Sequence, residues 1–257
     1  MKQIEGLADL AALVNNIGGN AMKSTEIIFL IDKSGSMSHL VGDTIGGFNG
    51  FVASQKALEG KATLTTVLFD TTWKTLHDGV DIQEVKPMTN SDYSAYGGTA
   101  MLDAIGDTIN KVQDRHDELG AEKPEKVLFV ITTDGEENSS HKFNKSQIEK
   151  MIKHQTNGHG WEFMFLGANM DSVKEAASIG INYDRAVTYD YSSVGTKAVY
   201  DTITAATCSL RCDSLTEDFD LSSAYATSID GCAKACTVDA LEGCISNATD
   251  CNITITG

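Results

Sequence analysis

Two runs of five consecutive apolar residues, at positions 27–31 and 127–131, constrain the fold of this 257-residue chain more than any other feature. A strand with one solvated face alternates apolar and polar residues, whereas these two runs are apolar on both faces. Such runs are typical of central strands in a parallel sheet that helices cover on both sides, and most of residues 162–166 repeat the pattern. The sequence therefore predicts an α/β fold with a core of parallel strands.

Apolar residues between these runs recur with the period of amphipathic helices. The first helical stripe consists of Ile45, Phe48, Phe51, Val52 and Leu58. The second consists of Leu102, Ile105, Ile109 and Val112. A shorter helix is marked by Ile148, Met151 and Ile152. Residues 171–180 predict one more helix, with Asp171 as its N-cap and Gly180 at its C-terminal end.

Two neighbouring segments predict an edge of the sheet. Residues 63–69 and 73–80 are separated by too few residues for a helical crossover, so we expect an antiparallel hairpin there. The rest of the chain alternates strand and helix, and it continues to a strand at 185–189 and a helix at 193–210. We therefore predict a doubly wound, mostly parallel sheet with one antiparallel edge strand and helices on both faces. In such folds, ligands bind beyond the carboxyl ends of the strands.

The charge of the chain limits the classes of partner. The formal net charge is -16, and no run of lysine or arginine is present. Nucleic-acid binding needs a basic surface that releases counterions, so we expect no nucleic-acid partner. No stretch reaches the roughly 18 apolar residues that a membrane span needs.

Residues 1–22 are predicted to form an N-terminal extension. The apolar stretch at 7–14 has one lysine before it and no clear small-residue cleavage site after it, so we do not expect a signal peptide. An amphipathic segment ahead of the first strand is the simpler interpretation. Without a signal peptide, the prediction is a cytoplasmic protein.

Oxygen-bearing side chains directly follow the two central strands. Asp32, Ser34 and Ser36 come after the first run, and Asp134 comes after the second. The alternate spacing lets a loop turn both serine hydroxyls in one direction. Mg²⁺ prefers a shell of hard oxygen ligands and usually retains several waters, so a few protein oxygens suffice. We therefore predict a divalent metal site at the carboxyl ends of these strands.

These residues resemble the metal-ion-dependent adhesion site (MIDAS) of the von Willebrand factor A domain family. The family pattern is Asp-x-Ser-x-Ser after the first strand, a Thr on a later loop and an Asp after the fourth strand. Here "DKSGSM" matches the first element, Thr99 in "YGGTAMLDAI" matches the second, and Asp134 in "TTDG" matches the third. The resemblance covers about residues 25–210, and stand-alone bacterial and phage members look most similar, to judge from "FLGANMD" and "ASIGINYD".

The resemblance implies a protein-binding module, not an enzyme, and assigns no catalytic residue. It implies that Mg²⁺, or Mn²⁺ or Ca²⁺ in its place, is held by Asp32, Ser34, Ser36, Thr99 and Asp134. Because only two of these ligands carry a formal charge, the cation can accept a Glu or Asp side chain of a partner protein. In some members, exchange of metal contacts is coupled to movement of the last helix. The rim residues expected to select the partner are Ser38, His39, Tyr96, Glu136, Asn169 and Asp171.

Three alternatives stay open on the sequence alone. Asp32 and Asp134 could cap turns or helices, and Thr99 could be the N-cap of the helix that it begins. A Mg²⁺-dependent hydrolase could use the same pocket, with Asp134 as the general base. A phosphotransferase of the haloacid-dehalogenase type is not among the alternatives, because it would need a second Asp where this chain has Ser34. A structural subunit could carry a vestigial metal site.

The histidines and tryptophans do not predict a further metal or ligand site. Four histidines show no partner at metal-ligand spacing and are expected at the surface: His39, His141, His154 and His159. Trp73 and Trp161 are expected to be packing residues.

The composition changes near residue 210, beyond which Ser, Thr, Ala and Asp dominate. We therefore predict an N-terminal extension at 1–22, a von Willebrand A-like domain at 23–210 and a cysteine-rich segment at 211–257. The six cysteines are Cys208, Cys212, Cys232, Cys236, Cys244 and Cys251.

These cysteines allow three interpretations. Two CxxxC pairs could offer four thiolates to a structural Zn²⁺, although such sites usually show CxxC spacing. Six cysteines could instead form three disulfides, which would stabilise a segment poor in apolar residues and would indicate secretion. They could also remain reduced thiols. Sequons at Asn247 and Asn252 matter only in a chain secreted from a eukaryote.

Overall fold

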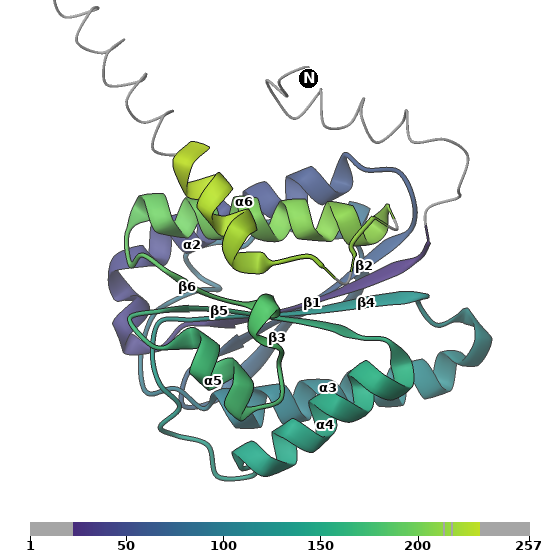
Figure 1. Ribbon diagram of the computed structural model, residues 1–257, viewed down its shortest axis with the longest axis horizontal. Helices are drawn as coiled ribbons and strands as arrows, with labels where there is room; N and C mark the ends of the chain where they lie inside the picture. Colours follow the sequence, from purple (N-terminus) through teal and green to yellow (C-terminus); the bar gives the residue numbers. More distant parts are fainter. Residues whose placement is uncertain (1–22, 213, 217, 232–257) are drawn as a thin grey trace, which may run out of the picture.

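A six-stranded sheet forms the centre of the protein in the computed structural model, which describes residues 23–212, 214–216 and 218–231 (Figure 1). The strands are β1 (Thr25–Asp32), β2 (Ala62–Phe69), β3 (Trp73–Asp81), β4 (Lys126–Thr133), β5 (Glu162–Ala168) and β6 (Ala186–Tyr189). They lie in the order β3-β2-β1-β4-β5-β6. All neighbours pair in parallel except β2 and β3, which form the predicted antiparallel hairpin at one edge. The predicted fold class is confirmed.

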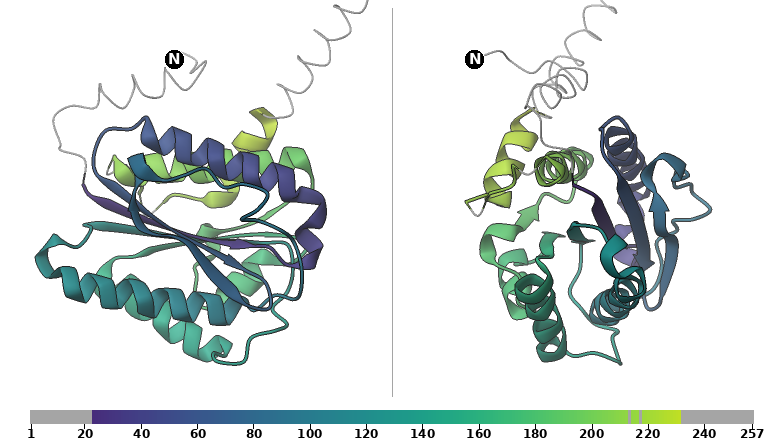
Figure 2. Two further views of the ribbon diagram at one scale, coloured as in Figure 1. Left: turned by 180° about the vertical axis from the view of Figure 1, so that it is seen from behind. Right: turned by 90° about the vertical axis from the view of Figure 1, so that its right-hand side faces the viewer.

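Helices cover both faces of the sheet, and Figure 2 shows these layers from two further sides. One face carries α2 (Val41–Lys56) and α6 (Ser193–Arg211), and the other carries α3 (Met101–Leu119), α4 (Lys145–His159) and α5 (Ser172–Ser178) (Figure 1). Short 3₁₀ helices are η1 (Gly35–Leu40), η2 (Ile82–Glu84), η3 (Gly120–Glu122) and η4 (Tyr183–Arg185).

The residues of β1 show why the central strands are apolar on both faces. Ile27, Phe29 and Ile31 pack in the cluster that contains α2 and α6, whereas Ile28 and Leu30 pack in the cluster that contains α3 and α4. All five side chains are fully buried. Burial of a large apolar side chain contributes about 1.5–3 kcal/mol, so the strand is held firmly in the middle of the sheet.

The helices follow the predicted stripes with one difference. α2 ends at Lys56, so Leu58 lies just beyond the helix although its side chain is buried. Asp171 is the N-cap of α5, as predicted, because its side chain accepts a hydrogen bond from the backbone N–H of Lys174 at 3.1 Å. Gly180, with φ of +87°, follows the end of that helix in a backbone conformation that favours glycine.

The core extends into residues that follow α6. Residues 221–231 are helical, and Leu221 and Tyr225 are buried in the same cluster as α2 and α6. Arg211, at the end of α6, is buried and donates hydrogen bonds to the backbone carbonyls of Gln55, Glu59 and Gly60. These contacts fasten the end of α6 to the end of α2.

Most of the cysteine-rich segment lies outside the described residues. Cys208 is buried, Cys212 is half-buried, and both are free thiols whose pKa is raised by burial. Residues 1–22 lie outside the described part of the chain, as do Cys232, Cys236, Cys244 and Cys251. The domain division and the zinc and disulfide hypotheses therefore stay predictions. Within residues 23–231, as far as they are described, no helix is long and apolar enough to cross a membrane.

Candidate metal site

Two neighbouring strands end at the same edge of the sheet, next to the predicted carboxylates. β1 and β4 run in parallel with Ile31 opposite Thr132, so Asp32 and Asp134 emerge side by side. Parallel strands place the loops that follow them at one edge. The loops after β1, before α3 and after β4 meet here, and all three elements of the predicted site come together.

Asp32 is fully buried and firmly oriented. Its Oδ1 accepts a hydrogen bond from the backbone N–H of Ser34 at 2.7 Å, and its Oδ2 accepts one from Oγ1 of Thr133 at 2.6 Å. Burial raises the pKa of Asp32 to about 6, although both hydrogen bonds oppose this, and the nearby Asp134 carboxylate raises it further. In the part of the chain that the structure describes, no basic side chain pairs with Asp32.

A row of hydroxyls connects the two carboxylates. Oγ of Ser34 and Oγ of Ser36 are 3.1 Å apart, and Oγ of Ser36 donates to Oδ1 of Asp134 at 2.6 Å. Ser34 is buried whereas Ser36 is exposed. The oxygens therefore lead from the interior at Asp32 to the surface.

Asp134 has one carboxylate oxygen without a partner. The residue is only 3% exposed, and its buried Oδ2 accepts no hydrogen bond from any described residue. Burial raises the pKa of Asp134, although the hydrogen bond from Ser36 lowers it. Buried polar atoms are normally paired, and an unsatisfied one costs about 1–3 kcal/mol or more when it is charged. Such an oxygen is expected where a cation binds.

Thr99 faces the same small volume as Ser36. A Cβ placed on Gly135 would lie 3.7 Å from Oγ1 of Thr99 and 3.7 Å from Oγ of Ser36. Thr99 is buried, and it does not cap α3, because the N-cap position is held by Ala100 without a side-chain hydrogen bond. The alternative in which Thr99 is a helix cap is therefore wrong.

The loop after β4 is tied to the start of α3. Oδ1 of Asn138 accepts a hydrogen bond from the backbone N–H of Thr99 at 2.9 Å. Oε2 of Glu137 accepts one from the backbone N–H of Leu102, also at 2.9 Å. Glu137 thus satisfies an N–H group that the first turn of α3 leaves free, and Asn138 holds the residue just before the N-cap, Ala100. As a result, the loops that carry Thr99 and Asp134 are held together.

Asp103 reinforces this connection from the helix side. Its carboxylate accepts hydrogen bonds from the backbone N–H groups of residues 141, 142 and 143 at 2.8, 2.9 and 2.9 Å. Burial alone would raise the pKa of Asp103, but the three N–H donors outweigh it and hold the pKa below its usual value. The carboxylate is thus ionised and fixes the far end of the same loop.

Two tyrosines hold the backbone of the serine loop, one at Asp32 and one at Ser36. The hydroxyl of Tyr93 donates to the backbone carbonyl of Asp32 at 2.5 Å. The hydroxyl of Tyr191 donates to the backbone carbonyl of Ser36. Gly97, in the loop after Tyr93, has φ of +79°, a conformation that glycine adopts without strain.

Several of these supporting residues were not predicted from the sequence. Thr133, Glu137 and Asn138 lie next to Asp134 in "TTDGEEN", so their proximity to the site was readable although their partners were not. Tyr93 is 61 positions along the chain from Asp32, and Tyr191 is 155 positions from Ser36. No pattern in the sequence indicates that they come together.

The predicted rim residues all lie at the surface. They are Ser38, His39, Tyr96, Glu136, Asn169 and Asp171. Tyr96 is 79% exposed and offers a large apolar surface on the loop that precedes Thr99. Asp171 also caps α5, so its carboxylate is partly engaged.

The donor set suits a hard divalent cation. It contains two carboxylates and three hydroxyls, and small cations such as Mg²⁺ take oxygen ligands and retain waters. The described residues contain no group of three or more His, Cys, Asp or Glu side chains that could hold a metal. A site here therefore depends on hydroxyls as well as carboxylates. The unpaired oxygen of Asp134 fits such a cation, and metal binding by the five residues stays a prediction.

Comparisons with known proteins bear on the fold. No protein-family model matches the chain, and no curated protein matches its sequence. Proximal thread matrix protein 1 from the mussel byssus, solved with a zinc-occupied MIDAS motif, aligns at 16% identity and a TM-score of 0.52 over 73% of this chain and 46% of its own. The pilus adhesin SpaC from Lactobacillus rhamnosus GG aligns at 13% identity and a TM-score of 0.53 over 74% of this chain and 30% of its own. A von Willebrand factor type A structure from Catenulispora acidiphila aligns at 17% identity and a TM-score of 0.48. The alignment covers 74% of this chain and 43% of that structure's chain.

This chain spans less than half the length of these three structures. Identities this low speak for the fold and not for a shared partner or ligand. The strand order, the antiparallel β3 and the meeting of three loops at the ends of β1 and β4 agree with the resemblance that the sequence motifs indicated. The chain has the fold of a von Willebrand factor A domain.

Proposed function

We propose that this chain is a metal-dependent protein-binding module that captures an acidic side chain of a partner protein through a divalent cation, with Mg²⁺ as the expected ion. The cation would be held by Asp32, Ser34, Ser36, Thr99 and Asp134. The observation that carries the proposal is the buried Oδ2 of Asp134, which has no hydrogen-bond partner among the described residues. The zinc-occupied MIDAS motif of the mussel protein supports it by analogy.

The chain's own residues prepare the site. Ser34 and Thr133 orient the carboxylate of Asp32, and Ser36 orients that of Asp134. When bound, a divalent cation supplies an electrophilic centre to which a further carboxylate oxygen can bind. The exposed side of the site, at Ser36, lets a partner side chain approach from solvent.

Metal binding is tested by calorimetric titration of Mg²⁺, and then Mn²⁺, into chelator-stripped protein. We expect one saturable site in the wild type. Asp134→Asn and the double variant Asp32→Ala/Ser34→Ala should lose it, because each removes a ligand oxygen. Asp114→Asn is the matched control, since Asp114 is an exposed aspartate of α3, and it should bind like the wild type. Equal binding by all variants would contradict the assignment of the ligands.

Carboxylate capture is tested on the Mn²⁺-loaded protein through the relaxation of water protons. A short peptide that contains one Asp should displace water from the ion and lower the relaxation rate to a plateau. The same peptide with Asn in place of Asp should leave the rate unchanged. If both peptides have no effect while Mn²⁺ stays bound, the chain binds metal but does not capture acidic side chains in this way.

A metal-dependent hydrolase is the competing hypothesis. It predicts turnover of a phosphate or carboxylate ester in the presence of Mg²⁺, with loss of turnover in Asp134→Asn. The binding module predicts no turnover in either protein, and loss of metal in the variant. Hydrolysis that follows the metal occupancy of the wild type would replace our proposal.

A further inference from the structure

His154 and His159 lie close together at the C-terminal end of α4. Their ring centroids are 5.2 Å apart, and the ring planes make an angle of 73°. Both side chains are exposed. The sequence did not predict this pair, because residues five apart point about 140° apart around a regular helix. Both histidines lie at the surface, as expected, and the structure adds a contact between their rings.

The position of the His154 ring along α4 is marked by Gly158. A Cβ placed on this residue would lie 3.9 Å from Nδ1 and Cε1 of His154, so the His154 ring lies over the last turn of the helix. α4 ends directly after His159, at Gly160, whose φ is +67°. Both imidazoles therefore gather where the helix ends.

The separation of the rings suits two ligands of one ion. A Zn–N bond of about 2.0–2.1 Å places the ion about 3.2 Å from the centre of each imidazole. Ring centres 5.2 Å apart then subtend about 109° at the ion, the angle of tetrahedral zinc sites. Edge-to-face packing of two rings also gives centroid separations of about 4.5–7 Å, so the experiment must separate packing from ligation.

The chemistry of the pair differs from that of the site at Asp32. Imidazole nitrogens suit Zn²⁺, Cu²⁺ and Ni²⁺, whereas carboxylates and hydroxyls suit Mg²⁺. The C-terminal end of a helix also carries a partial negative charge that favours a cation. No third His, Cys, Asp or Glu completes the group within the described residues, so water would have to complete the shell of a bound ion. α4 starts at the edge of the sheet where β4 ends and runs to the opposite edge, which separates the two sites (Figure 1).

We propose that His154 and His159 form a second, surface metal site for a borderline transition metal such as Zn²⁺. This site is independent of the oxygen-ligand site, which lies at the carboxyl ends of the strands, whereas the histidines lie near the start of β5. The pair provides two nitrogen ligands at the end of one rigid helix. This inference does not depend on the proposed function.

The test follows the imidazole Cε1–H signals by NMR while Zn²⁺ is added to the full chain in saturating Mg²⁺. We expect the signals of His154 and His159 to change together along one saturable curve, and those of His39 and His141 to stay in place. In His154→Ala, the His159 signal should need at least about tenfold more Zn²⁺, because loss of even an indirect partner of a metal ligand lowers affinity about 10–100-fold. His141→Ala is the matched control, and it should leave the curve unchanged.

Two results would overturn the proposal. The first is an unchanged pair of signals at millimolar Zn²⁺, which would mean that the rings only pack together. The second is an unaltered His159 response in His154→Ala with the fold intact by thermal unfolding. Asp134→Asn should keep the Zn²⁺ response of the pair, so failure of the oxygen-ligand site and failure of this one are distinguishable.

Discussion

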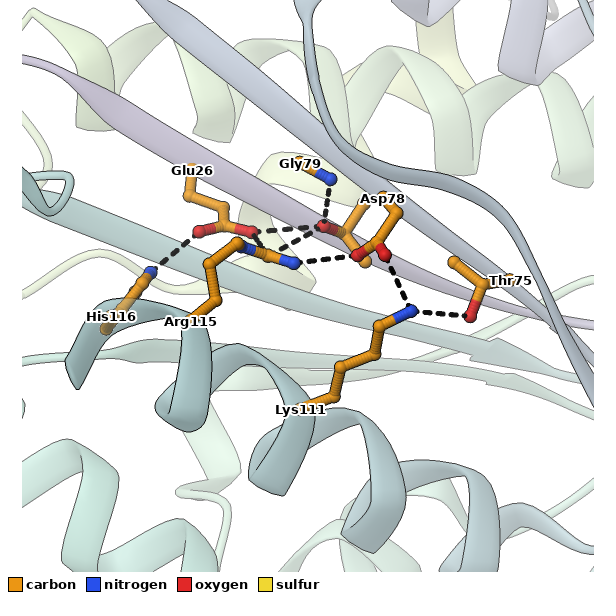
Figure 3. A network of polar contacts seen from close by, with 8 residues as sticks. Glu26, Thr75, Asp78, Gly79, Lys111, Arg115 and His116 are labelled. Atoms are coloured by element: carbon orange, nitrogen blue, oxygen red, sulfur yellow. Dashed lines mark hydrogen bonds and ion pairs between the residues drawn. The ribbon is translucent and has the colours of Figure 1, made fainter. Parts of the chain in front are cut away.

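β1 carries a buried carboxylate at each end, and the two have opposite surroundings. Glu26, at the start, is 1% exposed, and Asp32, at the end, is 0% exposed. Glu26 is paired with Arg115, and its oxygens also lie 3.0 Å from Oγ1 of Thr65 and 2.7 Å from Nε2 of His116 (Figure 3). Among the described residues, Asp32 receives hydrogen bonds from a backbone N–H and from hydroxyls, and it pairs with no cation.

The network at Glu26 continues to the surface. Arg115 also donates to Asp78 at 2.7 Å, and Lys111 pairs with Asp78 at 2.8 Å (Figure 3). Every charge in this row has an opposite charge beside it. Burying a carboxylate is unfavourable unless it is paired, so the chain supplies the cation at Glu26. At Asp32 and Asp134 it supplies none among the described residues, and this difference separates a structural carboxylate from one that is prepared for a cation from solution.

The largest effect is expected from removal of Glu26. Glu26→Ala leaves Arg115 and His116 beside an empty position, and breaking a buried ion pair costs about 3–5 kcal/mol. We expect a loss of that size in the free energy of unfolding, measured with urea. Asp78→Ala removes the exposed partner of Arg115 and should cost at most about 1 kcal/mol. Equal losses for the two variants would mean that burial does not distinguish Glu26.

The next effect is stabilisation of the opposite end of β1 by metal. An ion that binds only the folded state at 100 times its Kd adds about 2.7 kcal/mol. For a chain of this size, that corresponds to a rise of about 5–10 °C in Tm. Thermal unfolding with and without Mg²⁺ measures it. Asp134→Asn should show no rise, whereas Glu26→Gln should show the wild-type rise from a lower starting Tm. The same rise in Asp134→Asn would place the responsible ion elsewhere.

Neutralising Asp32 should have the opposite sign to neutralising Glu26. Burial raises the pKa of Asp32 from 3.8 to about 6, so the folded, metal-free protein binds the proton more tightly than the unfolded chain. Its stability therefore falls as the pH rises from about 4 to about 6, and the penalty is complete above that range. At pH 7 we expect metal-free Asp32→Asn to be more stable than the wild type by about 1–3 kcal/mol.

Urea unfolding in the presence of a chelator, at several pH values between 4 and 7, measures this difference. The two proteins should have similar stability at the acid end, where Asp32 is protonated. A variant that is less stable than the wild type at pH 7 would show that an undetected cation on the chain already pairs with Asp32.

The smallest effect is expected at Thr133, the hydroxyl that supports Asp32. Thr133→Val keeps the shape of the side chain and removes a hydrogen bond of 2.6 Å to the carboxylate. Hydrogen bonds to charged groups contribute about 1.5–3 kcal/mol, and the metal-free carboxylate is partly protonated at neutral pH and below, so we expect a loss near 1.5 kcal/mol. Urea unfolding and Mg²⁺ titration together check it. Thr132→Val, on the neighbouring residue, is the control, because its hydroxyl donates a long hydrogen bond of 3.4 Å to a backbone carbonyl and does not contact the Asp32 carboxylate.

Much of the site was predictable because it is local in the sequence. Asp32, Ser34 and Ser36 lie within five positions, and Asp134 follows a second apolar run of the same kind. In the structure, Ser36 bonds to Asp134 and lies within hydrogen-bond distance of Ser34. Thr99 was also predicted to join them, and the structure faces its hydroxyl toward the same glycine as Ser36.

The surrounding support was not predictable in the same way. Glu137 caps a helix that precedes it in the chain, Asn138 holds the residue before that helix's N-cap, and the N-cap residue itself, Ala100, has no side-chain hydrogen bond to offer. The contact between the His154 and His159 rings, at the end of α4, depends on side-chain conformations that no sequence pattern encodes. Regular helical spacing predicts that the two side chains point about 140° apart.

The sequence by itself determined the layers of the fold, the alternation of strands and helices along the chain, and the four oxygen-bearing residues that follow two central strands, Asp32, Ser34, Ser36 and Asp134. It did so because burial on two faces, helical periodicity and the ends of parallel strands are properties of short segments. Only the tertiary structure decided which buried carboxylate receives a partner. Glu26 and Asp32 are six positions apart on one strand, yet Arg115 and His116 come from α3 to reach the first of them, and no described basic residue reaches the second. Long-range charge pairing depends on how the helices pack, and no local pattern encodes it.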